Sequence, residues 1–367
     1  MHVRVQVVDP SAFTPPYDHA LCRSLAGAGA QVELYTCRSR AEVAPADGYA
    51  RHEFFYRGSR LVGEAPARQL VKLAEHVPDM LRYRHAARAA EVVHFQWLTV
   101  PHVDGRLLPR ERPLVLTAHD IRSREPRPGQ RRAERSVVRH FDAVVVHSER
   151  GRERLLDELG VDEARVHVIP HGAFLHLTEG DEVAPRFETE LPVVLFFGLL
   201  RPYKGIDLLL EAWRGIEGAE LWIVGKPRLD ISTLTAAAPA NVRFDPRFVA
   251  DAELRGYFRR AELVVLPYRE ADQSGVLFTA LAFAKPLLVS DVGGLAELAA
   301  SGAARAVPTG DVQALRGALE ELLADPAQLR AIAARGGAAA RERYAWEDIG
   351  RRTLALYATL LGENGAR

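Results

Sequence analysis

The stretch PVVLFFGLLRPYKGIDLLLEAW, residues 192–213, joins an apolar strand to an amphipathic helix through a turn that carries two cations. Its run Val193–Phe197 is typical of a buried parallel strand. The chain then turns at Gly198, presents Arg201 and Lys204, and continues in a helical pattern with one apolar face. A helix N-terminus flanked by cations is suited to phosphate, because its N–H groups and its dipole favour anions.

A second stretch, residues 263–294, has the same order of strand, loop and helix. Arg201 and Lys204 alone could be solvated loop residues, but the second stretch favours a phosphate site. Its run Leu263–Leu266 predicts a strand, and a helix is expected to begin at Ser274, with that residue as its N-cap. Gly275 leaves room for a ligand to approach the amides of the first helical turn. The two stretches together predict one site that binds an anion.

The combination of G-x-x-RPYKG, an acidic loop before a glycine-led helix, AxAxxKP and SDVGGLAE resembles the donor half of glycosyltransferase family four. The resemblance covers nearly the whole chain and is most specific in the C-terminal half. It implies the α/β GT-B fold, in which two doubly wound Rossmann-like domains face each other across a cleft. It also implies a retaining glycosyltransferase with a nucleotide diphosphate sugar as donor and a hydroxyl acceptor on a glycan, a lipid-linked or a small molecule.

The length of 367 residues, 48% of them hydrophobic, is sufficient for two ordinary domain cores. We expect an N-terminal acceptor-side domain over residues 1–172 and a linker over residues 173–190. The nucleotide-sugar-binding domain is then expected over residues 191–343. The last residues, 344–367, predict a helix that crosses back to the N-terminal domain in this fold.

Charge is balanced over the whole chain but not along it. Residues 1–150 contain 23 Lys and Arg against 17 Asp and Glu, so this half is basic. The basic segments Arg51–Arg88, which has helical spacing around residues 67–87, and Ile121–Arg139 are candidate surfaces for an acceptor or an anionic membrane. The alternative is an ordinary solvated surface. Of the 48 cations of the chain 44 are arginines, which suggests that arginine stands wherever a surface cation is tolerated, whether or not it binds a ligand.

Other compositional features predict a cytoplasmic protein that is soluble or peripheral to the inner face of a membrane. No apolar run approaches the ~20 residues that span a bilayer. The two cysteines, Cys22 and Cys37, fit a reducing compartment. A nucleic-acid partner is not expected, because the formal net charge of the whole chain is zero.

Three residues near the ends of expected strands, Tyr17, Gln96 and Trp97, are the candidates on the acceptor side, and His119 is a catalytic candidate. Tyr17 follows the loop DPSAFTPP, residues 9–16, and Gln96 with Trp97 ends the strand VVHFQ. His119 follows the strand LVLT, and in the family that this chain resembles the corresponding residue lies against the donor sugar. For Trp97 core packing, and for His119 a hydrogen bond within its loop, remain the alternatives.

On the donor side the resemblance implies that Glu270 binds the sugar hydroxyls and stabilises the oxocarbenium-like centre, with Asp272 as its rival. The second glutamate of the family's motif, which holds the ribose, is replaced by Thr279. Glu270 precedes Thr279 by nine positions instead of the usual eight, which leaves the nucleotide base open. The expected donor-binding residues are Gly198, Gln273, Ser274, Gly275, Val276 and Thr279.

Loss of a diphosphate leaving group requires positive charge, which some glycosyltransferases supply with a metal ion held by Asp-x-Asp. The chain contains no Asp-x-Asp. We therefore predict transfer without a metal or other cofactor, with Arg201, Lys204 and helix amides stabilising the phosphate. Two rival functions stay open: a nucleotide-sugar 2-epimerase on the same fold, and a non-catalytic nucleotide-sugar-binding partner protein, which the replacement at Thr279 motivates.

Overall fold

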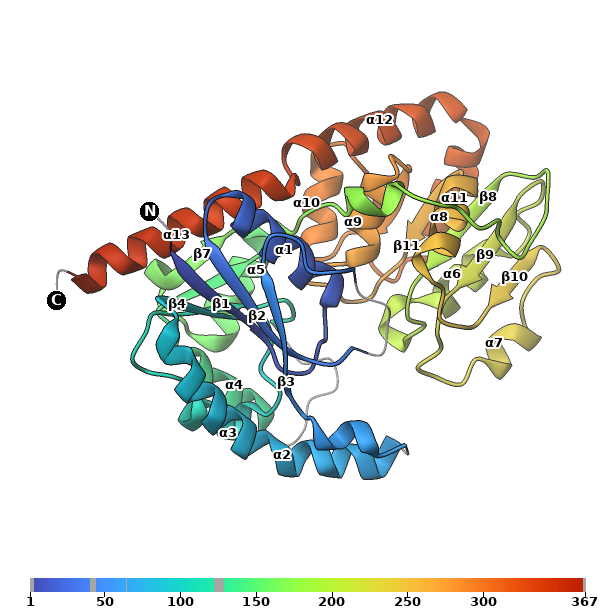
Figure 1. Ribbon diagram of the computed structural model, residues 1–367. Coiled ribbons are helices and arrows are strands. Elements are labelled where there is room, and N and C mark those ends of the chain that lie inside the picture. The colour runs from blue at the N-terminus through green and yellow to red at the C-terminus, as the bar shows by residue number, and fades with distance from the viewer. Residues whose placement is uncertain (1–2, 40–43, 64, 122–128, 366–367) are drawn as a thin grey trace. The chain divides into compact units, whose positions relative to one another are not determined.

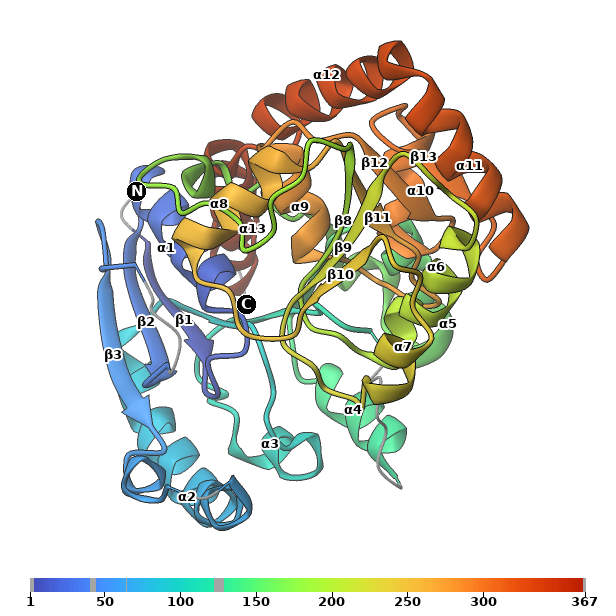
Figure 2. The ribbon, with the colours of Figure 1, turned by 90° about the vertical axis from the view of Figure 1, so that its right-hand side faces the viewer.

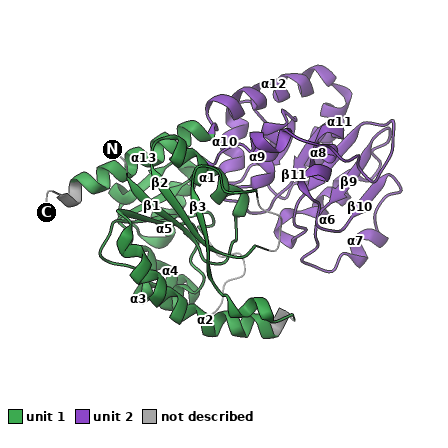
Figure 3. Cartoon of the chain, viewed as in Figure 1, with its two compact units in different colours: residues 1–170, 346–367 green, residues 171–345 purple. Residues whose placement is uncertain are grey.

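The computed structural model describes residues 3–39, 44–63, 65–121 and 129–365. The chain forms two compact units, which Figure 3 shows in separate colours. Unit 1 contains residues 1–170 and 346–367, and unit 2 contains residues 171–345. Each unit is a parallel sheet covered by helices on both faces (Figures 1 and 2).

The sheet of unit 1 has seven strands within the described residues, and all of their pairings are parallel. Most of these strands are rich in valine and buried on both faces, as expected for parallel strands between helical layers. In their order across the sheet they are β3 (Ala50–Phe55), β2 (Gln31–Cys37), β1 (Arg4–Asp9), β4 (Val92–Phe95), β5 (Leu114–Thr117), β6 (Ala143–Val146) and β7 (Val166–Val168).

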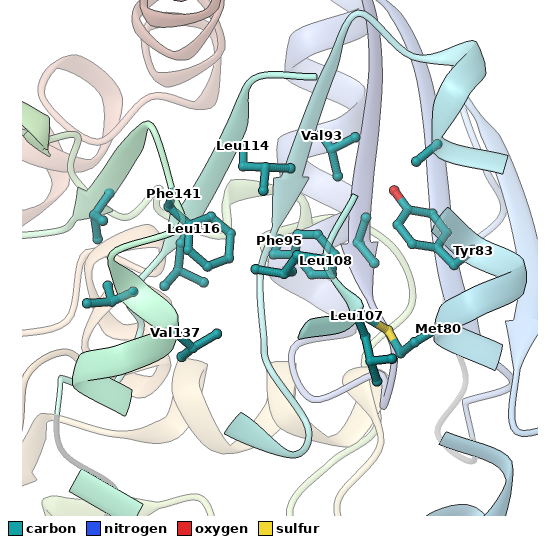
Figure 4. Packing of buried hydrophobic residues seen from close by; sticks show 14 of the residues in the cluster. Met80, Tyr83, Val93, Phe95, Leu107, Leu108, Leu114, Leu116, Val137 and Phe141 are labelled. Carbon is teal, nitrogen blue, oxygen red and sulfur yellow. The ribbon is translucent and has the colours of Figure 1, made fainter. Parts of the chain in front are cut away.

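Alternate strand residues of unit 1 contribute to two separate cores. Val144 and Val146 pack in the core that Figure 4 shows, whereas Ala143 and Val145 pack on the opposite face. The first core also contains side chains from the helices α2, α3, α4 and α5, and the second contains side chains from α1 and α13. The helices of unit 1 are α1 (Pro15–Gly27), α2 (Ala65–Ala86), α3 (Pro101–Leu107), α4 (Gln130–Val138), α5 (Glu149–Leu159) and α13 (Trp346–Gly365), with the 3₁₀ turns η1 (Gly58–Leu61), η2 (Ala87–Ala89) and η3 (Glu163–Arg165).

Helix α13, from the end of the chain, is built into the N-terminal unit. It packs along α1 so closely that a Cβ added at Gly350 would lie 2.7 Å from the backbone of Ser24. The Tyr357 hydroxyl lies 2.6 Å from Nδ1 of His94, and Nε2 of His94 lies 2.7 Å from the Thr117 hydroxyl. Burial lowers the pKa of His94 to about 3, so the ring is neutral near pH 7 and is matched by a hydroxyl at each nitrogen.

The sheet of unit 2 is also parallel, with six strands among the described residues. In order across the sheet these are β10 (Val242–Asp245), β9 (Glu220–Val224), β8 (Val193–Phe197), β11 (Leu263–Leu266), β12 (Leu287–Ser290) and β13 (Arg305–Val307). The helices of unit 2 are α6 (Ile206–Trp213), α7 (Ser232–Ala236), α8 (Asp251–Arg260), α9 (Gly275–Ala282), α10 (Gly293–Ala300), α11 (Val312–Ala324) and α12 (Pro326–Glu342), with the 3₁₀ turns η4 (Leu175–Thr178) and η5 (Pro202–Lys204).

In both sheets the direction of winding reverses at a central pair of strands, β1 and β4 in unit 1 and β8 and β11 in unit 2. Open α/β sheets bind ligands beyond the carboxyl ends of the strands at such a reversal. The loops after these four strands carry most of the residues that the sequence predicts as functional.

Some predicted bounds shift in the structure. The first strand, β1, is described from Arg4 onward and ends at Asp9, where the predicted loop 9–16 begins. The helix expected to begin at Ser274 is α9, and it ends at Ala282, two residues before Ala284, whose positive φ of 48° a helix cannot continue through.

The structure also locates the basic run 121–139 and the expected linker 173–190. Of the basic run 121–139, Arg122, Arg124 and Arg127 lie outside the described residues, and the run then continues into α4. Residues 173–190, expected as a linker, pack within unit 2, where the Val183 N–H donates to the Ala252 carbonyl.

Among the described residues, no helix combines the length and the apolar character needed to cross a bilayer. The same residues contain no group of three or more His, Cys, Asp and Glu side chains arranged to hold a metal ion.

The contact between α13 and the core of unit 1 generates a stability prediction. Tyr357→Phe leaves one nitrogen of the buried His94 without its hydroxyl partner, so we expect it to lower the free energy of unfolding of unit 1 by about 1–3 kcal/mol. Urea unfolding followed by tryptophan fluorescence measures this change. Thr359→Ala, on the exposed side of the same helix, is the control and should change stability by less than about 0.5 kcal/mol. Equal effects of the two variants would contradict the role of the hydroxyl.

Candidate active site

In unit 2 the loop after β8 folds back over the start of α9. Gly198, the first residue of this loop, has a φ of +104°. A Cβ at this position would lie 3.0 Å from Cγ2 of Val276 and 3.2 Å from Nζ of Lys204. Gly198 therefore permits both the turn and the close approach of Lys204 to the first turn of α9.

Lys204 is an unusually buried cation, with 7% of its surface exposed. Its Nζ lies 5.1 Å from the centroid of the Tyr268 ring, and the Tyr268 hydroxyl lies 3.5 Å from the Ser274 hydroxyl. Lysine is rarely buried to this extent without a compensating negative charge or ring face. The loop after β8, the loop after β11 and the start of α9 thus surround one ammonium group.

The N-terminus of α9 contributes backbone donors to the same place. Ser274 is the N-cap residue, as predicted, but its side chain makes no capping hydrogen bond. The first N–H groups of a helix, here those of Gly275 and Val276, have no partner within the helix. The hydroxyl of Thr279 donates to the carbonyl of Gly275 at 2.9 Å, so this buried side chain is satisfied inside its own helix.

Arg269 ties the loop after β11 to the loop after β8, and sequence reasoning missed it. Its guanidinium grips both carboxylate oxygens of Asp207 at 2.8 and 2.6 Å and donates to the Pro202 carbonyl at 3.1 Å. Its backbone N–H donates to the Tyr203 carbonyl at 2.7 Å. The hydrogen bond from Arg269 lowers the pKa of Asp207, as expected for a carboxylate in a bidentate ion pair.

Arg201 and Glu270 line a hollow of about 490 Å³ in the surface of unit 2. Glu270 is exposed, whereas Asp272 is 8% exposed and its carbonyl accepts a hydrogen bond from Gly294 N–H. Of the two predicted carboxylates, Glu270 is therefore the one with access to a ligand in this hollow. The hollow is also lined by Pro202, Tyr203, Ile206, Asp207, Leu229, Asp230, Thr233, Leu234 and Arg269.

The structure thus brings Gly198, Lys204, Ser274 and Val276 together around one point, and Arg201 and Glu270 around one hollow. Gln273 lies elsewhere in the loop after β11, with its side chain over Gly294 at the start of α10. Thr279 offers its hydroxyl to the helix backbone. Gly275 is exposed at the first turn.

In unit 1 the three predicted acceptor-side residues, Tyr17, Gln96 and Trp97, surround the predicted catalytic residue His119. The Trp97 ring stacks on the His119 ring with centroids 5.1 Å apart and an interplanar angle of 14°. The buried ring of Tyr17 lies perpendicular to the His119 ring, with centroids 4.6 Å apart and an interplanar angle of 89°. Nε2 of His119 lies 3.1 Å from Oε1 of Gln96, and Trp97 donates from Nε1 to the Thr14 hydroxyl at 2.9 Å. Loops from three strands therefore hold the imidazole in one orientation.

His147, at the end of β6, determines which nitrogen of His119 carries a proton. Nδ1 of His147 lies 2.9 Å from the Ile169 carbonyl, which can only accept, so this nitrogen is protonated. Burial lowers the pKa of His147 to about 4, so at neutral pH its Nε2 is an acceptor. Nδ1 of His119, at 3.3 Å, therefore donates to it.

Gln96 can accommodate both protonation states of His119. Its Oε1 accepts a hydrogen bond from a protonated Nε2, and after a turn of 180° its amide group donates to a neutral Nε2. Nε2 of Gln96 is buried and has no partner among the described residues, so neither orientation breaks a second hydrogen bond. The cluster thus fixes the position of the imidazole without fixing its charge.

Sequence reasoning missed His147, although a signal was present. DAVVVH places a polar residue at the carboxyl end of a strand, as LVLTAHD does for His119. Trp346, from α13, also joins the cluster through a ring contact of 5.1 Å with Tyr17. Its place could not be read from the sequence, because it lies more than 300 positions away.

Comparison with family models matches both parts of the chain. The model described as Glycosyltransferase Family 4 matches residues 17–175, and the model described as Glycosyl transferases group 1 matches residues 191–325. D-inositol 3-phosphate glycosyltransferase of Kineococcus radiotolerans is 27% identical over 94% of this chain and 90% of that protein. GDP-mannose:glycolipid 4-beta-D-mannosyltransferase of Xanthomonas campestris pv. campestris is 30% identical over 69% of this chain and 70% of that protein.

Solved structures show the same fold over almost the whole chain. Sucrose-phosphate synthase of Thermosynechococcus elongatus aligns with a TM-score of 0.79 and 20% identity over 99% of this chain and 100% of that one. HepE of Anabaena, solved in complex with UDP-glucose, aligns with a TM-score of 0.74 and 18% identity over 98% of this chain and 100% of that one. The predicted fold class, two Rossmann-like parallel-sheet domains of the GT-B type, is confirmed.

Removal of the Arg269 guanidinium should loosen the loop that carries Arg201 and Lys204. We expect Arg269→Gln to weaken the binding of nucleoside diphosphates about tenfold, or ~1.4 kcal/mol, as measured by isothermal titration calorimetry. Arg305→Gln breaks an exposed ion pair with Glu321 in the same unit and should leave the affinity unchanged. An affinity that is equal in both variants would show that the Arg269 contacts do not position the site.

His147 should give unit 1 a dependence of stability on pH. Its folded pKa, about 4, lies below the ~6.5 of an unfolded histidine, so the wild type loses stability as pH falls from ~6.5 towards 4. Asn at this position keeps a donor for the Ile169 carbonyl and does not titrate. As pH is lowered through this window, the free energy of unfolding of His147→Asn should rise relative to that of the wild type by about 1.4 kcal/mol per pH unit. Urea unfolding at several pH values measures this difference. A constant difference between the two proteins would contradict the lowered pKa.

Proposed function

Because the chain belongs to glycosyltransferase family 4, we propose that it is a retaining hexosyltransferase that uses a nucleotide diphosphate sugar and needs no metal ion. The chain matches this family in both units, which makes it a glycosyltransferase of the GT-B type. The observation that carries the donor assignment is the buried ammonium of Lys204 between the turn at Gly198 and the first turn of α9.

The diphosphate of the donor is assigned to the groups around Lys204. The ammonium, the first amides of α9 and the guanidinium of Arg201 supply positive charge for the phosphate that leaves. Glu270, on the hollow that Arg201 also lines, is suited to accept hydrogen bonds from sugar hydroxyls. The absence of Asp-x-Asp from the sequence supports charge stabilisation by these fixed groups in place of a bound metal ion.

The acceptor is assigned to unit 1, to the side of the cluster that contains Tyr17, Gln96 and Trp97, with His119 as the catalytic residue beside it. Aromatic faces beside hydrogen-bonding side chains suit a polyhydroxyl molecule. Relatives support a hydroxyl acceptor: the names of two of them specify an inositol phosphate and a glycolipid. A lipid-linked acceptor is therefore within the proposed range.

The reaction is proposed to proceed on one face of the sugar. The bond between the anomeric carbon and the leaving diphosphate oxygen breaks, and the acceptor oxygen bonds to the same carbon from the same side. The proton of the acceptor hydroxyl passes to the leaving phosphate oxygen, so the products are the glycoside and the nucleoside diphosphate. His119, held by Gln96 and His147, is suited to orient hydroxyls near this centre.

A thermal-shift panel of UDP-, GDP-, ADP- and TDP-sugars in the presence of EDTA tests the donor site and identifies the base. One nucleotide sugar at a hundred times its Kd should stabilise the protein by about 2.7 kcal/mol. We expect Arg201→Ala and Lys204→Ala to abolish this shift. Arg214→Ala, an exposed cation at the end of α6, is the control and should retain it. A shift seen only with added metal would overturn the metal-free site.

The products then separate transfer from the rival functions. Release of the nucleoside diphosphate only when an acceptor is added supports glycosyl transfer. Conversion of the donor sugar with no second substrate would indicate an epimerase. Tight donor binding without turnover, over a broad set of glycan and glycolipid acceptors, would indicate a non-catalytic partner protein.

A further inference from the structure

Helix α2 of unit 1 exposes a row of large apolar side chains. Leu70, Leu73, Val77 and Leu81 are 70%, 58%, 41% and 52% exposed, and their spacing of three and four residues puts them on one face of the helix. We call these four residues the α2 stripe. Leu61, at the end of the turn η1 just before α2, is 90% exposed. Exposed leucines and valines grouped in this way mark an interaction site, whereas single ones do not.

The α2 stripe is not the face by which the helix packs on its own unit. The opposite face carries His76, Asp79, Met80 and Tyr83, all buried, and Met80 and Tyr83 lie in the core of Figure 4. Figure 1 shows α2 at the outer edge of unit 1. The helix is therefore held by one face and leaves the other available.

The acidic side chains described in α2 are turned towards the protein. Glu75 accepts hydrogen bonds from the backbone N–H groups of Gly58 and Ser59 at 2.6 and 3.0 Å. Asp79 is buried and accepts from the Tyr56 N–H at 2.6 Å and from Arg82 at 2.7 Å. Neither carboxylate therefore adds negative charge to the α2 stripe.

Cations continue the same face where the apolar residues end. Arg84 is exposed and follows Leu81 by three residues on the same face of α2, and Arg88, also exposed, lies just beyond the helix in the turn η2. Arg110 and Arg112, in the loop after α3, lie beside them around a shallow surface hollow. Glu111, paired with Arg88 at 3.2 Å, is the acidic residue described among them, so the group is strongly positive.

We propose that the α2 stripe and this basic end form a docking surface for an anionic lipid bilayer. An amphipathic helix that lies in the membrane interface buries an apolar face among the acyl chains and places cations against anionic headgroups. The leucines and arginines of this surface are complementary to those two layers. Charge complementarity selects an anionic bilayer over a neutral one, and the exposed leucines select a bilayer over a soluble anion.

Docking would bring the acceptor-side unit to a lipid-linked acceptor, and this consequence rests on the proposed function. Binding to the bilayer does not rest on it. The test is therefore carried out without donor or acceptor, and the thermal shift with nucleotide sugars is measured separately on the same variants. A variant that loses vesicle binding but keeps its thermal shift with nucleotide sugars would be defective in the docking surface alone.

The experiment is flotation of the full chain with vesicles of phosphatidylglycerol and phosphatidylcholine, and with vesicles of phosphatidylcholine alone. We expect binding to the anionic vesicles, weakened by added salt, and at most weak binding to the neutral ones. The double variant Leu73→Gln/Leu81→Gln should bind at least about tenfold more weakly, because two apolar side chains are lost from the buried face. Arg84→Gln and Arg110→Gln should each lower the affinity for anionic vesicles about fivefold.

Leu191→Gln is the matched control, since Leu191 is also an exposed leucine, 41% accessible, but lies in unit 2. It should bind like the wild type, and all of these variants should keep the wild-type melting temperature because they change exposed side chains. Absence of binding to anionic vesicles, or unchanged binding of the double leucine variant, would overturn the proposal. So would sedimentation that shows a wild-type dimer and a monomeric Leu73→Gln/Leu81→Gln variant, since the α2 stripe would then be an interface between copies.

Discussion

The candidate site of unit 2 depends on the contact between two loops, the one after β8 and the one after β11. Gly205 makes the contact possible, because a Cβ there would lie 2.1 Å from the Pro267 carbonyl oxygen. Arg269 then fastens the loops by its grip on Asp207 and its hydrogen bonds to the β8 loop. The ammonium of Lys204 stays buried only if the loops around it are held in place, because a mobile loop would let this charged group become solvated.

The central strands could be predicted from the sequence because burial on both faces leaves a strong signal. The runs Val193–Phe197 and Leu263–Leu266 coincide with β8 and β11. The edge strand β3, with the sequence ARHEFF, was not predicted as a strand and was included in the basic segment Arg51–Arg88. Its polar residues hide the strand pattern, because an edge strand with a half-exposed face tolerates them. Helix α3, only seven residues long, is too short to establish a helical period.

For the site, the sequence could indicate which residues lie at the carboxyl ends of strands, but not which of them touch. Tyr17, Gln96, Trp97 and His119 were predicted separately, and they meet because parallel register carries their strand ends to the same edge. The contact of His147 with His119 depends on the pairing of β5 with β6. Contacts of this kind follow from tertiary register, on which local sequence is silent.

Helix α13 also sets the order in which a newly synthesised chain can become native. Unit 1 fills one of its two cores with Ile349, Tyr357 and Leu360, which are synthesised after the whole of unit 2. Unit 2 is a single uninterrupted segment, residues 171–345, and is complete before α13 emerges. The usual vectorial order, with the N-terminal domain folding first during synthesis, is thereby reversed. Until α13 has emerged, the apolar face of α1 that receives it stays exposed to solvent.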